Sequence, residues 1–139
     1  MPASYDSEAA ALRRFTSRYE IWGAGASRLI DMEVCGAELG TNGYTTMAQA
    51  DALVDVLRLR PGVRLLDVGA GLGWPSLYLA AASGCEAVVT DIPATAVRDA
   101  AQRAEKRRLS DRASFAVASA VHLPFRPSSF DAIVHTDTL

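Results

Sequence analysis

The sequence contains few cysteines, no excess of basic residues and no long apolar segment, and each absence excludes a class of protein. Among its 139 residues are two cysteines, Cys35 and Cys85, and neither has a cysteine or histidine partner at metal-ligand spacing. A disulfide-stabilised scaffold and a metal site are therefore not expected. No stretch reaches the length of a membrane span, and charged residues interrupt the first twenty positions, where a signal peptide needs an apolar core. We expect a cytoplasmic protein with no membrane partner.

The charge balance excludes a further class of partner. Lysine and arginine together number 14 and aspartate and glutamate 16, so the formal net charge is −2 and no basic surface is expected to attract a polyanion. Nucleic acid is therefore not an expected partner. Half of the residues are hydrophobic, which suits a globular domain of this length with a core of its own.

The first third of the chain has a helical pattern, a glycine-rich segment and a second helical pattern. Residues 4–22 place apolar side chains at helical spacing, which predicts an amphipathic helix. The segment 23–44 is rich in glycine, so its secondary structure is not determined, and it is interpreted as a lid or a linker. Thr46 and Gln49 have the spacing of a capping box, which predicts the start of another helix. We therefore divide the chain into an N-terminal helical extension or lid, 1–45, and a domain, 46–139.

From residue 63 onwards, short apolar strand patterns alternate with helical patterns. Such alternation predicts a parallel sheet with right-handed crossovers, and ligands bind these sheets at the carboxyl ends of the strands. The predicted fold class is therefore α/β. Strands are expected at 63–68, 87–90, 114–118 and 130–135, and helices at 76–82 and 95–108.

The run from Leu65 to Trp74 joins the first strand to a helix through an acidic residue and three closely spaced glycines. Free N–H groups at the start of a helix, and the absence of glycine side chains, let a ligand approach the backbone closely. The spacing GxGxG differs from the dinucleotide fingerprint GxGxxG, because Trp74 stands where the third glycine is required. Asp67 would also repel a pyrophosphate, whereas it could accept hydrogen bonds from a cationic or hydroxylated ligand. The loop therefore favours a positively charged nucleoside over a dinucleotide.

At these residues the chain resembles the class I S-adenosylmethionine-dependent methyltransferases, whose first motif is an acidic residue followed by GxGxG at the end of the first strand. Here that motif spans Asp67 to Gly73. The resemblance extends to Asp91 at the end of the second strand, and to LPF at 123–125 and SFDAIV at 129–134, which are similar to a signature that leads into the fourth strand. It covers roughly residues 42–139 and implies a Rossmann-like three-layer αβα sandwich with a partial parallel sheet in the order 3-2-1-4.

The resemblance also implies roles for individual residues around S-adenosylmethionine as the cofactor. Asp91 would accept hydrogen bonds from the two ribose hydroxyls, and Ile92 would pack on the adenine. Where this family often has an aspartate for the adenine amino group, this chain has Ser119, a weaker acceptor. The implied cofactor-binding residues are Asp67, Gly69, Ala70, Gly71, Gly73, Asp91, Ile92, Ser119 and Ala120.

The methyl acceptor is less well defined by the sequence. His135 and Asp137 follow the expected fourth strand, where the methyl group would be presented, and they are the candidates to face the acceptor. The hypothesis is an S-adenosylmethionine-dependent methyltransferase that acts on a small molecule. A non-catalytic, vestigial cofactor-binding or interaction module is the alternative, and an NAD-dependent oxidoreductase is a weaker one.

A full member of this family has seven strands, of which four are expected here. The later strands supply much of the acceptor pocket, so we expect a truncated chain that lacks its acceptor-binding half. The fourth strand would then form an open edge at Ile133 and Val134, and one face of the sheet would lack covering helices. We expect a homodimer or another partner to cover this edge and this face.

Overall fold

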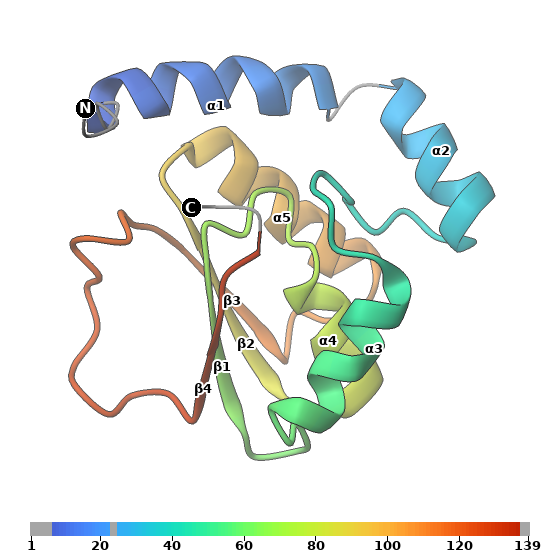
Figure 1. The fold of residues 1–139 in the computed structure, drawn as a ribbon, viewed down its shortest axis with the longest axis vertical. Helices are drawn as coiled ribbons and strands as arrows, with labels where there is room; N and C mark the ends of the chain where they lie inside the picture. The colour runs from blue at the N-terminus through green and yellow to red at the C-terminus, as the bar shows by residue number, and fades with distance from the viewer. Residues whose placement is uncertain (1–6, 23–24, 137–139) are drawn as a thin grey trace, which may run out of the picture.

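The computed structural model describes residues 7–22 and 25–136 and contains a four-stranded parallel sheet (Figure 1). The strand order β3-β2-β1-β4 confirms both the expected α/β class and the expected order. The strands are β1 (Arg64–Val68), β2 (Glu86–Asp91), β3 (Ala113–Val117) and β4 (Ala132–Val134). The helices are α1 (Glu8–Trp22), α2 (Gly25–Cys35), α3 (Met47–Val56), α4 (Ser76–Ser83) and α5 (Ala94–Lys106).

Strand register determines which side chains face the helices. Leu65 pairs with Ala87, and Asp67 pairs with Val89 on one side and Val134 on the other, so these five residues share a face of the sheet. That face packs against α3, α4 and α5, which lie on the same side in Figure 1, and its apolar residues form two buried clusters with these helices. Asp67 therefore points into the helix-covered layer.

The opposite face of the sheet carries Leu66, Val88 and Ile133. In Figure 1 the loop 118–131 lies on the side of the strands away from α3 and α4. Leu66 and Val88 are buried, but Ile133 on the edge strand β4 is 58% exposed. An exposed apolar residue on an edge strand matches the expected open edge. That a second copy or another partner covers this edge stays a prediction.

Strand β4 is shorter than the expected 130–135, because the residues before it make other contacts. Phe130 packs edge-on against Phe125 with 5.0 Å between ring centroids, and the guanidinium of Arg64 lies 5.3 Å from the Phe130 centroid. The Asp131 carboxylate accepts a hydrogen bond of 2.8 Å from the backbone N–H of Arg64. These contacts join the end of the loop to the start of β1 without extending the strand.

Three helices precede the first strand of the sheet, and the second of them, α2, was not predicted. Helix α1 confirms the expected helix over 8–22, while its expected start at 4–6 lies outside the described residues. Helix α2 lies in the segment whose structure the sequence left open. Asp31 of α2 is buried, and its carboxylate accepts hydrogen bonds from the backbone N–H groups of Gly40 at 2.7 Å and Thr41 at 3.3 Å, and from the Thr41 hydroxyl. This carboxylate fixes the loop that follows α2. Within the described ranges, no helix has the length and apolar character needed to cross a membrane.

The expected capping box at the start of α3 is present. The Thr46 hydroxyl accepts from the Gln49 backbone N–H at 3.2 Å, and the Gln49 side-chain oxygen accepts from the Thr46 backbone N–H at 2.8 Å. We expect Thr46→Ala to lower the free energy of unfolding by about 1 kcal/mol, because an N–H of the first turn loses its partner. Urea unfolding measures this change. Thr46→Ser keeps the hydroxyl and should stay close to the wild type, so an equal loss in both variants would contradict the capping role.

Candidate cofactor site

The carboxyl ends of all four strands lie at one edge of the sheet, and α1 runs across this edge in Figure 1. The glycine loop 69–73 follows β1, and Asp91 is the last residue of β2. Two backbone hydrogen bonds hold this edge together, from Ala70 N–H to the Thr90 carbonyl at 2.9 Å and from Ala118 N–H to the Asp91 carbonyl at 3.0 Å. The structure therefore gathers residues that are far apart in the sequence.

The three glycines of the loop adopt backbone conformations that other residues rarely adopt. Gly69, Gly71 and Gly73 have φ values of 70°, 55° and 95°. A Cβ on Gly73 would lie 2.7 Å from Cδ1 of Leu77, so the third glycine also allows the loop to pack closely on α4. The GxGxG spacing is thus explained by backbone geometry as well as by access for a ligand.

The Asp91 carboxylate organises the loop from the neighbouring strand. One oxygen, Oδ2, accepts from Gly71 N–H at 2.7 Å and from the Tyr19 hydroxyl at 3.3 Å, and the other, Oδ1, accepts from Ile92 N–H at 2.7 Å. Burial raises the pKa of Asp91 above its ordinary value, and these hydrogen bonds oppose the rise. The carboxylate stands at the end of β2, in the position that the sequence resemblance gives to a ribose acceptor.

The Asp67 carboxylate lies beneath the loop at the start of α4 and is completely buried. Both of its oxygens and the hydroxyl of Ser76 lack a hydrogen-bond partner among the described residues. Burial raises the pKa of Asp67 to about 7, and the nearby charge of Asp91 adds to the rise. The Ser76 hydroxyl and backbone N–H lie near enough to lower this pKa in part, although neither makes a hydrogen bond of ordinary geometry. A completely buried carboxylate cannot touch a ligand above the loop, so any effect of Asp67 on such a ligand would act through its charge.

Two residues of the N-terminal extension reach the glycine loop, and sequence patterns did not identify them as site residues. A Cβ built on Gly71 would meet the Asn42 side-chain amide and would lie 3.0 Å from the Tyr19 ring and hydroxyl. Tyr19 is buried and Asn42 is half-buried. Helical spacing places Tyr19 on the inward side of α1, but that signal does not separate a core tyrosine from one whose hydroxyl reaches a carboxylate.

A buried arginine, Arg103, fixes the far side of the loop, and no sequence pattern predicted this role. Arg103 of α5 donates a hydrogen bond of 2.6 Å to the Leu72 carbonyl, and its other terminal nitrogen lies 3.4 Å from the Glu38 carboxylate. Its guanidinium also lies 2.9 Å from the position of a Cβ on Gly40. Arg103 therefore links the glycine loop to the segment that follows α2.

The other predicted site residues lie at the same edge with weaker evidence for a role. Ile92 is half-buried beside Asp91. Ser119 forms a tight turn with His122, in which its carbonyl accepts from His122 N–H at 3.0 Å, and Ala120 in that turn is exposed. His135 is exposed just after β4, and the second candidate for the acceptor, Asp137, lies outside the described residues.

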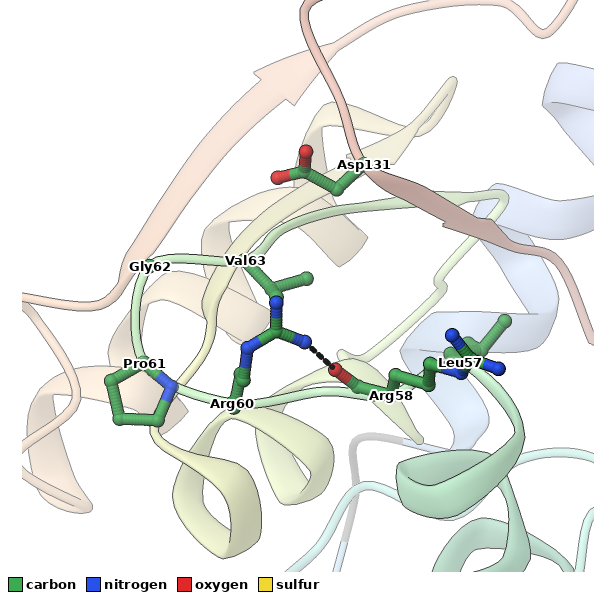
Figure 2. Close-up of a pocket in the computed structure, with 7 residues that line it drawn as sticks. All are labelled: Leu57, Arg58, Arg60, Pro61, Gly62, Val63 and Asp131. Carbon is green, nitrogen blue, oxygen red and sulfur yellow. Dashed lines mark hydrogen bonds between the residues drawn. The ribbon is translucent and has the colours of Figure 1, made fainter.

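A separate pocket lies at the opposite edge of the sheet, where β1 begins (Figure 2). Figure 2 shows the Arg60 side chain hydrogen-bonded to the Arg58 carbonyl at 3.2 Å, with Asp131 on the other side of the opening. The Asp131 carboxylate is already engaged by Arg64 N–H. This pocket is therefore separate from the glycine loop. Its lining residues are Leu57, Arg58, Arg60, Pro61, Gly62, Val63 and Asp131.

The charge of the loop edge selects among ligands. Asp67 and Asp91 are both buried, and the charge of Asp91 adds to the cost of ionising Asp67. A pyrophosphate would add negative charge to this pair, whereas a cation would stabilise both carboxylates, and a diol could donate hydrogen bonds to Asp91. The orphaned Asp67 carboxylate and the acceptor oxygens of Asp91 therefore fit a hydroxylated, positively charged ligand.

Comparison with known proteins agrees with this chemistry. The family model of the methyltransferase domain matches residues 65–139. The chain is 43% identical over 89 residues to the ubiquinone/menaquinone biosynthesis C-methyltransferase of Rhizobium leguminosarum bv. trifolii (strain WSM2304), a match that covers 61% of this chain and 34% of that protein. It is 35% identical over 102 residues to the 27-O-demethylrifamycin SV methyltransferase of Amycolatopsis mediterranei (strain S699), covering 73% of this chain and 38% of that protein.

A solved structure with bound ligands is also similar. The geranyl diphosphate C-methyltransferase from Streptomyces coelicolor A3(2), in complex with Mg²⁺, geranyl diphosphate and S-adenosyl-L-homocysteine, superposes with a TM-score of 0.59 and is 25% identical. The match covers 63% of this chain and 33% of that one. The chain therefore spans about a third of the length of the relatives that it matches.

Proposed function

The chain belongs to the methyltransferase domain family, and from this we infer that it binds S-adenosylmethionine at the glycine loop and forms part of an enzyme that methylates a small molecule. The observation that carries the inference is the pair of buried carboxylates at the loop, of which Asp67 has no hydrogen-bond partner among the described residues. A pair of this kind favours a cationic ligand and disfavours a pyrophosphate.

We propose a separate role in cofactor binding for each residue at the loop edge. Asp91 would accept hydrogen bonds from the ribose hydroxyls, because its carboxylate is the acceptor at the end of β2. The ligand would take the space beside Gly71 that Asn42 and Tyr19 now fill, and the charge of Asp67 would stabilise positive charge from beneath the loop. When bound, the cofactor supplies an activated methyl group on a sulfonium. The chain then contributes chiefly by holding the donor in place and keeping water away.

The acceptor class is proposed from the relatives. One relative is named for a rifamycin and one structural neighbour holds geranyl diphosphate, and both acceptors are small molecules. His135 follows β4 and is exposed at the donor edge, so it is the described residue that we propose to face the acceptor. Cys35 and Cys85 are both free thiols, which supports a reducing, cytoplasmic setting.

We expect Asp91→Asn to weaken the binding of S-adenosylhomocysteine by about ten- to a hundredfold. The substitution removes a charge-assisted acceptor, which contributes about 1.5–3 kcal/mol. It also turns one acceptor oxygen into a donor that faces the Gly71 or Ile92 N–H. Isothermal titration calorimetry of the wild type and the variant measures the change.

Asp131→Asn is the matched control, because Asp131 also accepts a backbone hydrogen bond at the margin of the sheet, but at the opposite edge. Its affinity should equal that of the wild type. NAD serves as the competing ligand and should give no binding heat. If the wild type bound neither S-adenosylmethionine nor S-adenosylhomocysteine, this chain would be the non-catalytic module that the sequence left as an alternative.

A further inference from the structure

The hydroxyl of Tyr19 is hydrogen-bonded to the Asp91 carboxylate, which in the proposed function accepts hydrogen bonds from the ribose. It donates to Asp91 Oδ2, the oxygen that also accepts from Gly71 N–H. Its ring and hydroxyl stand over Gly71, where a ligand would approach the loop. The burial of the hydroxyl and the negative charge of Asp91 raise the pKa of Tyr19, so it is a neutral donor near pH 7.

Counting acceptor positions shows that Tyr19 and a ribose diol compete. A carboxylate offers about four lone-pair positions. On Asp91 three of these are used, by Gly71 N–H, Ile92 N–H and the Tyr19 hydroxyl. The two N–H donors belong to the loop and strand backbone and cannot leave without unfolding the site. A diol needs two positions, so Tyr19 must give up the one that it holds.

Helix α1 is attached weakly enough to allow this exchange. Among its described side chains Tyr19 is the buried one, and it packs with Leu72 and Ala96. Phe15 supports it, with 6.0 Å between the two ring centroids, but Leu12 is 40% and Ile21 is 72% exposed. A helix with so few buried contacts can separate from the domain at low cost.

We propose, on the basis of the proposed function, that Tyr19 is a latch: its hydroxyl closes the ribose acceptor of Asp91, and α1 must release it before S-adenosylmethionine can bind. Binding of the cofactor and opening of α1 are then one linked equilibrium, and the closed form lowers the apparent affinity by the fraction of chain that is latched. Helix α1 thereby acts as a lid that competes with the ligand.

The test compares Tyr19→Phe with Tyr78→Phe in the full chain. Tyr78→Phe is the matched control, because it also removes a hydroxyl bonded to a carboxylate, that of Asp51, away from the loop. Calorimetry with S-adenosylhomocysteine should show about tenfold tighter binding by Tyr19→Phe than by the wild type. The phenylalanine ring keeps the packing of the tyrosine ring, but the hydrogen bond to Asp91 is lost. The control should bind like the wild type.

Hydrogen exchange gives a second readout that does not depend on activity. The backbone amides of α1 in the wild type should exchange faster when S-adenosylhomocysteine is bound, because the ligand displaces the latch. In Tyr19→Phe the same amides should exchange faster even without ligand. Slower exchange of α1 on binding would overturn the latch, because the helix would then be closing over the ligand.

The outcomes separate the latch from the proposed function. Equal affinities of Tyr19→Phe and the wild type, or weaker binding by Tyr19→Phe, would overturn the latch while cofactor binding stood. If neither protein bound the ligand, and a thermal melt showed both to be folded, the proposed function would fail and the latch with it.

Discussion

The free energy of unfolding of Asp67→Asn, relative to that of the wild type, is expected to be higher at pH 8 than at pH 5. The pKa of Asp67 is about 7 in the folded chain, against an ordinary value of 3.8. Between these two values the folded state keeps a proton that the unfolded state has released, so the stability contributed by this group falls as the pH rises from about 4 to 7 and is level above that. Asparagine does not titrate, so the substitution removes this dependence of stability on pH.

The size of the effect follows from the shift. One pKa unit corresponds to about 1.4 kcal/mol, so the difference in unfolding free energy between Asp67→Asn and the wild type should grow by about 3 kcal/mol from pH 5 to pH 8. Urea unfolding at the two pH values measures it. Any constant cost of burying the amide cancels in this comparison. Asp55→Asn, which changes an exposed carboxylate of α3, is the control for replacing a carboxylate by an amide. A difference for Asp67→Asn that did not depend on pH would contradict the buried charge.

The same substitution should separate two ligands that differ by one charge. S-Adenosylmethionine carries a positive sulfonium, whereas S-adenosylhomocysteine has a neutral sulfur. An ionised Asp67 attracts the positive sulfonium more strongly than the neutral sulfur. Asp67→Asn should therefore weaken the binding of S-adenosylmethionine by about tenfold and that of S-adenosylhomocysteine by less. The carboxylate would thus destabilise the folded chain and favour the cationic ligand, a trade-off between stability and function that is common at functional sites.

The sheet and its carboxyl edge could be predicted from the sequence because their signals are local. A continuous apolar run marks a strand covered on both faces, and the spacing Thr46 to Gln49 marks a helix start within four residues. The acidic residue followed by GxGxG is likewise read within one short segment. Each of these patterns depends on neighbours in the chain, so one sequence is enough to identify it.

The contacts between the N-terminal extension and the domain could not be predicted, because they join residues far apart in the chain. Tyr19 and Asp91 are separated by 72 positions, and Arg103 and Glu38 by 65. The periodicity of apolar residues along the sequence does not indicate contacts between residues so far apart. Helix α2 was missed for a related reason: its polar Asp31 is buried to hold Gly40, while apolar Val34 is 76% exposed, so its pattern opposes the usual one.

Gly71→Ala is expected to remove ligand binding, with an affinity at least about a hundredfold lower than that of the wild type. The new methyl group would stand on the face of the loop that the ligand approaches, where Asn42 and Tyr19 now lie. The φ of 55° at this position is itself unfavourable for alanine, by about 1–2 kcal/mol. Calorimetry measures the affinity and urea unfolding measures the stability.

Gly62→Ala is the control for backbone strain. Gly62 has a φ of 89°, and a Cβ there meets nothing within 4 Å, so the variant has a similar conformational cost without a new contact. It should lose about the same stability from strain and keep the wild-type affinity. Loss of binding in Gly62→Ala as well would show that destabilisation alone removes the ligand.

The double variant Gly71→Ala with Asn42→Ala distinguishes two effects of the new methyl group. One is its clash with the Asn42 side chain, and the other is its occupation of the space that the ligand needs. Removing the Asn42 amide relieves the contact between the extension and the new methyl group, so part of the lost stability should return. Ligand binding should not return, because the methyl group remains on the loop. Recovery of both properties would instead mean that Asn42, and not the ligand, requires a glycine here. Gly71 would then serve the closed lid, and the cofactor would have to bind elsewhere along the edge.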